Sequence, residues 1–227
     1  MNATSKVYLV DDDEPFLLAQ SRMLGAAGMP VVAFDSATRL LACLSPEDHG
    51  CIVTDLFMPE MSGLDLQAAL MATGVVLPIV FLTGRADIPS TVHAMRDGAV
   101  DVLEKTTPCD VLLAAIRRAL ETDVHAQESR QHVAELRERF SRLTPREREV
   151  LQFVLGGSMN KQIAARLGIH ERTVKLHRTA ITMKLGVRSA AQISEMAHEA
   201  GLVISGQNAP EYHVPRYYSA GPYVPAR

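Results

Sequence analysis

Residues 51–59 read Cys-Ile-Val-Thr-Asp-Leu-Phe-Met-Pro. An apolar and β-branched run leads into one aspartate, and a proline follows four positions later, so the stretch predicts a buried strand with Asp55 at its C-terminal end. In an open parallel α/β sheet, ligands bind outside the carboxyl ends of the strands. Asp55 is therefore expected where a ligand can reach it, if neighbouring strands bring suitable partners to the same edge.

The sequence on both sides of this strand alternates predicted strands with predicted helices. Further strands are expected at residues 6–10, 31–34, 77–83 and 100–104. Helices are expected from Pro15, after Ser36, over residues 63–71 and 88–96, and from Pro108. Five such units in succession predict an α/β domain over residues 1–120, built on a doubly wound, five-stranded parallel sheet.

The predicted strand ends carry polar side chains that suit phosphoryl chemistry, namely Asp11, Asp12, Asp55, Thr83 and Lys105. A carboxylate that accepts a phosphoryl group needs a metal ion, a hydroxyl and a fixed cation around the new oxygens, and this set supplies each role. Mg²⁺ prefers carboxylate oxygens and water, so the aspartates are candidate ligands. Taken singly, each residue also has a structural explanation, such as a helix cap, a turn former or a solvated charge.

The two halves of the chain carry net charges of opposite sign. Residues 6–120 carry 8 basic and 15 acidic side chains, a balance of −7, whereas residues 142–201 carry 10 basic and 5 acidic, a balance of +5. This predicts two domains with different partners, a cation for the first and phosphates for the second. No apolar run approaches the roughly 20 residues of a membrane span, and no secretory signal is recognisable, so we expect a cytoplasmic protein without a membrane partner. The scattered cysteines, Cys43, Cys51 and Cys109, are expected to be reduced packing thiols.

The rest of the chain is expected to form a linker, a helical domain and a tail. Residues 121–141 lack proline and glycine and have few apolar positions, which are Val124, Val133, Leu136 and Phe140. They predict a helical extension of the last helix of the first domain, and a coiled coil between two such linkers is an open alternative. Residues 205–227 are rich in proline and tyrosine and are expected to be disordered.

Residues 142–204 predict an all-α domain of four helices. Thr144 and Glu147 form a capping box at the start of the first helix. The next helices are expected at residues 160–167, 172–185 and 190–199, and the short glycine-containing turn between the second and third is typical of a helix-turn-helix. The third helix carries five basic residues, Arg172, Lys175, His177, Arg178 and Lys184. Together with the positive balance of the domain, this favours insertion into a DNA major groove over a merely solvated face.

Several motifs of the first domain match a known family. They are Val10-Asp11-Asp12, Asp55-Leu56-Phe57-Met58-Pro59-Glu60-Met61-Ser62-Gly63, Leu82-Thr83-Gly84 and Gly98-Ala99-Val100-Asp101-Val102-Leu103-Glu104-Lys105. With them, residues 6–120 resemble the flavodoxin-like receiver domain of bacterial two-component response regulators. The resemblance implies that Asp55 is the phospho-acceptor, and that Mg²⁺ is held by Asp11, Asp12, Asp55 and the backbone carbonyl of Phe57. It also implies that Thr83 and Lys105 contact the phosphoryl oxygens.

Two positions depart from the pattern of that family. Receivers usually carry Phe or Tyr three residues before the lysine, where this chain has Val102, and proline after the lysine, where it has Thr106. Because a cis bond before a non-proline residue costs about 3 kcal/mol, we expect either a trans peptide at Lys105–Thr106 or visible strain. The acceptor residues are intact, so the departures concern the coupling of the site to the surface of the domain.

The second domain also carries family motifs, among them Leu143-Thr144-Pro145-Arg146-Glu147, Asn160-Lys161-Gln162-Ile163-Ala164, Arg172-Thr173-Val174-Lys175 and Lys184-Leu185-Gly186-Val187-Arg188-Ser189. It resembles the LuxR-type domain of NarL/FixJ regulators, and the domain order fits the FixJ branch. The resemblance places Lys175, Leu176 and Thr179 towards bases, and Asn160, Lys161, Thr173, His177 and Arg178 near phosphates. It also implies that the last helix pairs two DNA-binding domains.

These features predict a two-component response regulator. A sensor histidine kinase is expected to phosphorylate Asp55, and the phosphorylated chain to form a homodimer that binds specific double-stranded promoter DNA and regulates transcription. RNA polymerase is a further partner left open. The chain is not expected to be an enzyme, except that the receiver catalyses its own phosphorylation and dephosphorylation.

Two other functions are compatible with parts of this pattern. A Mg²⁺ phosphohydrolase of the haloacid dehalogenase type also forms an aspartyl phosphate, but it places a second aspartate two positions after the nucleophile, where this chain has Phe57. A regulator that binds DNA independently of phosphorylation is the other alternative. The intact set of Asp11, Asp12, Asp55, Thr83 and Lys105 argues against this alternative but leaves it open.

Overall fold

The computed structural model describes residues 5–84 and 87–202, and the predicted tail lies outside these residues. The chain forms two compact units, which divide between Gln127 and Glu128. Within the described residues, no helix is both long and apolar enough to cross a membrane.

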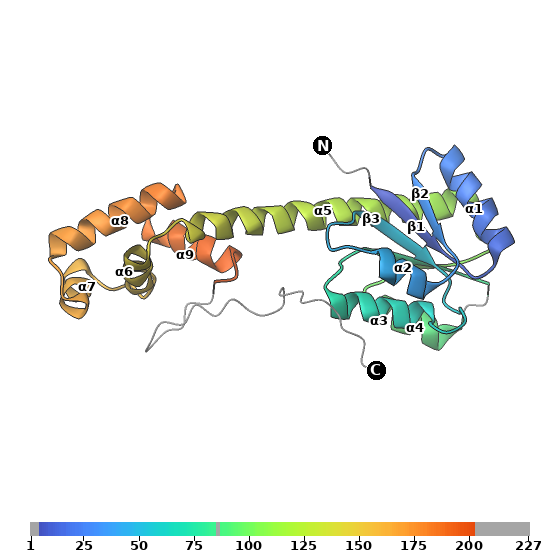
Figure 1. The fold of residues 1–227 in the computed structure, drawn as a ribbon, viewed down its shortest axis with the longest axis horizontal. Coiled ribbons are helices and arrows are strands. Elements are labelled where there is room, and N and C mark those ends of the chain that lie inside the picture. Colours follow the sequence, from blue (N-terminus) through green and yellow to red (C-terminus); the bar gives the residue numbers. More distant parts are fainter. Residues whose placement is uncertain (1–4, 85–86, 203–227) are drawn as a thin grey trace. The chain divides into compact units, whose positions relative to one another are not determined.

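The first unit is built on a five-stranded parallel sheet with the strand order β2-β1-β3-β4-β5, of which Figure 1 labels β1, β2 and β3. The strands are β1 (Lys6–Val10), β2 (Val31–Phe34), β3 (Gly50–Thr54), β4 (Ile79–Thr83) and β5 (Asp101–Glu104). Its helices are α1 (Glu14–Ala26), α2 (Ala37–Cys43), α3 (Gly63–Thr73), α4 (Ile88–Arg96) and the first part of α5 (Cys109–Ser141). The predicted doubly wound fold is confirmed, and the element bounds differ by a few residues at most.

Apolar side chains cover both faces of this sheet, and every residue of β3 and β4 is buried. One face packs against α1 and α5 through Leu24, Leu112 and Ile116. The other packs against α2, α3 and α4 through Leu40, Leu66 and Ala94. Because both faces are covered, these central strands read as continuous apolar runs, which is what made them recognisable in the sequence.

As far as the structure describes it, the second unit contains four further helices, as predicted, which are α6 (Pro145–Leu155), α7 (Asn160–Leu167), α8 (Glu171–Leu185) and α9 (Ala190–Glu199). Thr144 caps α6: its hydroxyl accepts from the amide of Glu147 at 3.2 Å, and its own amide donates to the Glu147 carboxylate at 2.7 Å. Gly168 ends α7 in the left-handed region, which gives the sharp turn into α8.

Residues 121–141, the predicted linker, are helical, because α5 continues without interruption to Ser141. Its last turns, however, belong to the core of the second unit: Leu136 and Phe140 are only 4% and 5% exposed and lie in one cluster with Val150 and Ile181. These two apolar positions are therefore used inside the unit. Because Leu136 and Phe140 are buried within the unit, they are not accessible as coiled-coil contacts to a second chain.

Candidate functional site

Three carboxylates meet at the C-terminal edge of the sheet. Asp11 and Asp12 follow β1, Asp55 follows β3, and the two strands are paired so that Val10 lies opposite Thr54. Asp11, Asp12 and Asp55 each offer an oxygen, and these oxygens lie within 4.8 Å of one another. Asp11 and Asp55 are buried, whereas Asp12 is exposed.

Lys105 brings a cation into this acidic cluster. Its ammonium nitrogen lies 2.7 Å from Oδ2 of Asp11 and 2.8 Å from Oδ2 of Asp55, and 4.5 Å from the centre of the Phe16 ring. Burial acts to lower the pKa of Lys105, but its bonds to the two carboxylates outweigh burial and raise the pKa. Burial raises the pKa of Asp11, although Lys105 and the backbone amide of Asp13 act against it.

Backbone groups hold the two buried carboxylates in place. The amide of Asp13 donates to Oδ1 of Asp11 at 3.0 Å, and the amide of Phe57 donates to Oδ1 of Asp55 at 3.1 Å. The loop after Asp55 turns sharply, with Glu60 at φ +64°, in the left-handed region that non-glycine residues seldom occupy. The following helix then starts close to Asp55: a Cβ on Gly63 would lie 2.3 Å from the carbonyl oxygen of Asp55.

Thr83 lies fully buried at the end of β4, the strand between those that carry Asp55 and Lys105. The amide of Lys105 donates to the Thr83 carbonyl oxygen at 2.8 Å, which ties the two strand ends together. The structure thus brings Asp11, Asp12, Asp55 and Lys105 into one cluster and places Thr83 on the strand beside it.

The donor set fits a small, hard divalent cation. Mg²⁺ takes one or two protein carboxylates and several waters in octahedral geometry, and three carboxylates with one exposed member leave room for this. The cluster combines two buried carboxylates with one lysine, so additional positive charge is electrostatically favourable there. The residues that the sequence predicted as ligands therefore suit the ion chemically.

The structure accommodates both departures from the receiver pattern, Val102 and Thr106, by ordinary packing and backbone geometry. Val102 lies half-buried in β5, opposite Phe81 of β4, and packs against the core cluster on the α2–α4 face of the sheet. The peptide between Lys105 and Thr106 is trans, as one of the two expected outcomes required. The Thr106 hydroxyl donates to the Glu104 carboxylate at 3.2 Å.

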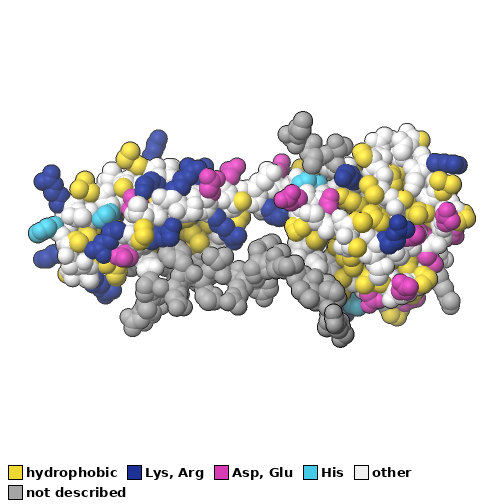
Figure 2. Space-filling model, in the orientation of Figure 1, with side chains coloured by type: hydrophobic (Ala, Val, Ile, Leu, Met, Phe, Trp, Pro, Cys, Tyr) yellow, Lys and Arg dark blue, Asp and Glu magenta, His cyan; other side chains and the backbone are white. Residues whose placement is uncertain are grey.

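In the second unit, α8 presents one face to solvent and the other to the core. Val174, Ile181 and Leu185 are buried. Of the eight residues predicted to contact DNA, Lys161, Lys175, Leu176 and Thr179 are exposed, and the other four, Asn160, Thr173, His177 and Arg178, are half-buried. On the face drawn in Figure 2, Lys and Arg side chains are frequent around these helices.

Two of the predicted phosphate-side residues are joined to each other. A guanidinium nitrogen of Arg178 donates to the side-chain oxygen of Asn160 at 3.1 Å, which links α8 to the start of α7. A second link runs from the end of α8 to α6: the Lys184 ammonium lies 2.7 Å from the Glu147 carboxylate. Lys184 is thus held by the capping box, a contact that spacing along the sequence does not reveal.

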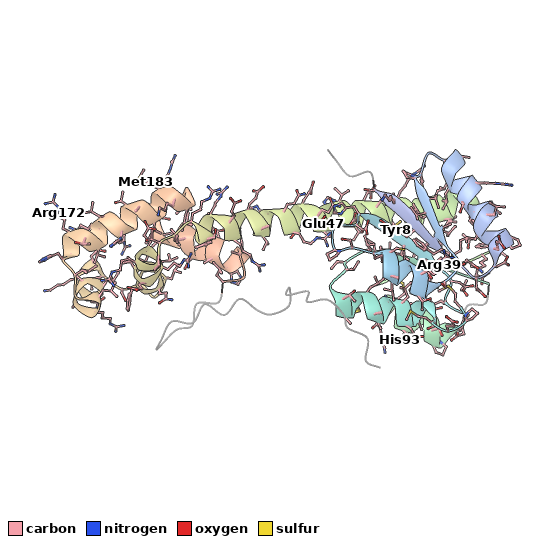
Figure 3. All side chains as sticks on the ribbon, viewed as in Figure 1. Tyr8, Arg39, Glu47, His93, Arg172 and Met183 are labelled. Atoms are coloured by element: carbon pink, nitrogen blue, oxygen red, sulfur yellow. The ribbon has the colours of Figure 1, made fainter. Side chains whose placement is uncertain are left out.

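Sequence reasoning also missed one exposed residue of α8. Met183 is 77% exposed, on the face that carries Leu176, although its residue type suggests burial. Figure 3 shows Arg172 near the start of α8 and Met183 near its end. The spacing of seven residues from Leu176 was the available signal, since residues seven apart share a helix face.

Two family models match the chain. Residues 7–117 match the response regulator receiver domain, and residues 141–197 match the luxR family of bacterial regulatory proteins. The chain belongs to the bacterial response regulators that join a receiver domain to a LuxR-type DNA-binding domain.

Relatives of this chain include transcriptional regulatory protein FixJ of Rhizobium meliloti, 38% identical over 86% of this chain and 96% of the relative. Nodulation protein W of Bradyrhizobium diazoefficiens is 40% identical over 86% of each chain, and response regulator protein TodT of Pseudomonas putida is 42% identical over 82% of each. The structure is similar to that of the response regulator StyR, with a TM-score of 0.75 at 43% identity over 87% of this chain and 100% of that chain. The predicted FixJ-type two-component regulator is confirmed at the level of family.

Proposed function

We propose that Asp55 is the phospho-acceptor of this regulator and that its phosphorylation by a sensor histidine kinase controls homodimerisation and sequence-specific binding to promoter DNA. The observation that carries this proposal is the position of Lys105. Its ammonium lies within 2.8 Å of both Asp11 and Asp55, so the cluster already holds the cation that a phosphoryl group on Asp55 requires.

In the reaction, a carboxylate oxygen of Asp55 attacks phosphorus of the kinase phosphohistidine. A bond forms between oxygen and phosphorus, the bond between phosphorus and the imidazole nitrogen breaks, and its electron pair stays on that nitrogen. The amide of Phe57 holds Oδ1 of Asp55 and thereby fixes the carboxylate plane. Lys105 and the hydroxyl of Thr83 then stabilise the new phosphoryl oxygens.

Mg²⁺ would be held by Asp11, Asp12, Asp55 and the carbonyl of Phe57. When bound, it neutralises negative charge on the phosphoryl oxygens. The receiver would catalyse its own phosphorylation and dephosphorylation and no reaction of an external substrate, since Phe57 stands where a phosphohydrolase of the haloacid dehalogenase type has its second aspartate.

The DNA-binding half of the proposal is supported by α8, whose outer face carries Lys175, Leu176 and Thr179 away from the buried side. Cationic side chains on an exposed helix suit the phosphate-lined major groove. Asn160, Lys161, Thr173, His177 and Arg178 would position the helix on phosphates, and α9 would pair two chains. A cytoplasmic location and contact with RNA polymerase go with this role.

The test is the oligomeric state by analytical ultracentrifugation with Mg²⁺, before and after addition of beryllofluoride as a phosphoryl mimic. We expect a monomer that becomes a dimer, and no dimer from Asp55→Asn. Asp110→Asn, an exposed aspartate on α5, is the matched control and should dimerise like the wild type. A dimer that forms equally in Asp55→Asn would refute control by this carboxylate.

A regulator that acts without phosphorylation is the second candidate, and Val102 is the observation that favours it. Shifting a two-state equilibrium from 1:99 to 99:1 requires about 5.5 kcal/mol of differential binding. The small side chain of Val102 offers no ring that could couple Thr83 to the surface of the domain, so less of this free energy would reach that surface. Tight and specific DNA binding by Asp55→Asn, equal to that of the phosphorylated wild type, would support this second function.

A further inference from the structure

The solvent face of α8 carries two large apolar side chains. Leu176 is 64% exposed and Met183 is 77% exposed, so neither contributes to the core. They are seven positions apart, which is 1.94 turns of an α-helix at about 3.6 residues per turn. They therefore lie almost on one line along the helix, about 10.5 Å apart at a rise of 1.5 Å per residue.

The buried side of α8 explains why Met183 is not a core residue. Val174, Ile181 and Leu185 lie on the opposite face and fill the cluster with α6, α7 and α9. The exposed face also carries Arg172 at the start of the helix, Lys175 one turn on and Thr179 between the two apolar residues. Figure 3 shows Arg172 and Met183 towards the two ends of α8, on a helix that is lined with side chains along its free side.

The positive charge on the exposed face of α8 indicates which kind of partner binds there. A cationic face with an apolar stripe is poorly suited to an apolar protein surface, because Arg172 and Lys175 would lose their water there. A DNA major groove offers phosphates to the cations and one apolar group to the stripe, the C5-methyl of thymine. Successive base pairs rise by about 3.4 Å along the DNA axis, and the groove runs obliquely to that axis, so about 10.5 Å along the groove spans at most about three base pairs.

We propose that Met183 is a further specificity-determining residue, which contacts a thymine methyl within about three base pairs of the base pair that Leu176 contacts. This inference rests on the proposed DNA-binding function of α8 and extends its base-facing surface by two helical turns beyond Leu176. The long, flexible methionine side chain reaches further than Ala or Val would and adapts its shape to an apolar surface.

The experiment begins with selection of binding sites from randomised duplex DNA by the full chain with Mg²⁺ and beryllofluoride. Wild type and Met183→Ala are compared, and we expect the variant to lose its preference for thymine at one position only. At that position, deoxyuridine in place of thymidine removes only the methyl group. It should weaken wild-type binding about fourfold, the effect of one buried CH₂, and should leave the binding of Met183→Ala unchanged.

Two further variants control the comparison. Met71→Ala removes a methionine of the receiver that is 66% exposed, and it should select the same sites as the wild type and keep the deoxyuridine effect. Met183→Leu keeps an apolar side chain and should retain part of the preference for thymine. Thermal unfolding of Met183→Ala should match that of the wild type, because the side chain is outside the core.

The outcomes separate the inference from the function on which it rests. If the wild type selects a site and Met183→Ala selects the same site with the same deoxyuridine effect, Met183 does not read thymine, while the proposed function stands. If the wild type selects no sequence at all, sequence-specific DNA binding itself is wrong, and the role of Met183 is wrong with it.

Discussion

Lys105 shows how much of the receiver chemistry depends on the reach of one side chain. It follows β5, which is an edge strand, yet its ammonium contacts Asp55 after β3 and Asp11 after β1. Its flexible stem passes Gly84 beyond the end of β4, where a Cβ would lie 3.8 Å from Cδ of Lys105. Removing Lys105 would leave the two buried carboxylates, Asp11 and Asp55, without the cation that both contact, which is costly because a buried charge needs a partner.

Gly63 is the residue whose size is most tightly limited at this site. A Cβ there would lie 2.3 Å from the Asp55 carbonyl oxygen and 2.9 Å from the Phe81 ring. We expect Gly63→Ala to lower the free energy of unfolding by about 1–3 kcal/mol, the usual cost of overpacking. Urea unfolding followed by circular dichroism measures this change.

The matched control for that substitution is Gly25→Ala, since Gly25 lies in α1 and has no atom within 4 Å of its added Cβ. Alanine is a better helix former than glycine by roughly 0.5–1 kcal/mol, so this variant should be as stable as the wild type or more so. Equal effects of the two substitutions would show that the close approach at Gly63 is not what constrains the loop.

At the scale of elements, the capping box of α6 does more than start that helix. The Glu147 carboxylate accepts from the amide of Thr144 and also pairs with Lys184, so the beginning of α6 holds the end of α8. The contact fixes one end of the helix that carries the predicted base-facing residues. Glu147 is therefore a positioning residue for α8.

This contact predicts a pH dependence of stability in the second unit. Burial acts to raise the pKa of Glu147, but the bonds from Lys184 and Thr144 outweigh it and hold the pKa below its ordinary value of 4.5. A depressed pKa means that the stabilisation is present above pH 4.5 and is lost as pH falls through the lower, folded-state pKa. Glu147→Gln should remove this dependence, and because glutamine can still accept from the Thr144 amide, the cost at neutral pH should be that of the lost ion pair with Lys184, about 0.5–1 kcal/mol.

Hydrogen exchange of peptides from α6 and α8 in the full chain, compared at several pH values, measures the effect in this unit alone. Glu195→Gln changes an exposed glutamate on α9 and should leave exchange in α6 and α8 unaltered. Wild-type and Glu147→Gln chains that lose protection in parallel on acidification would contradict the assigned role.

At the scale of the whole molecule, α5 supplies core residues to both units. Leu112 and Ile116 pack on the receiver sheet, whereas Leu136 and Phe140 pack among α6–α9. Two polar contacts add to the second attachment, since Arg137 donates to the Ala200 carbonyl oxygen at 2.9 Å and His132 lies 3.3 Å from Glu199. The DNA-binding unit therefore includes the last turns of α5.

Leu136→Ala tests this assignment. Truncation of a buried leucine typically costs 2–5 kcal/mol, so we expect hydrogen exchange in α6–α9 of the full chain to increase while exchange in β1–β5 stays unchanged. Glu135→Ala, at the exposed neighbouring position, should alter neither unit. Unaltered exchange in α6–α9 after Leu136→Ala would mean that the last turns of α5 do not support the second unit.

The sequence predicted the order of elements because the signals are local. Apolar runs in β3 and β4 mark strands buried on both faces, and polar residues at strand ends mark the edge where they meet. Thr144 and Glu147 likewise predicted the start of α6, since a capping box lies within four consecutive residues of the chain. The family motifs in both halves were recognisable for the same reason.

The sequence by itself therefore determined the two-domain architecture, the strand-end aspartates and the basic α8. Only the tertiary structure decided that Lys105 bridges Asp11 and Asp55, that Leu136 and Phe140 pack within the second unit, and that Glu147 holds Lys184. The physical reason is that such contacts join residues from about ten to almost one hundred positions apart. They depend on strand order, register and helix packing, which no local pattern specifies.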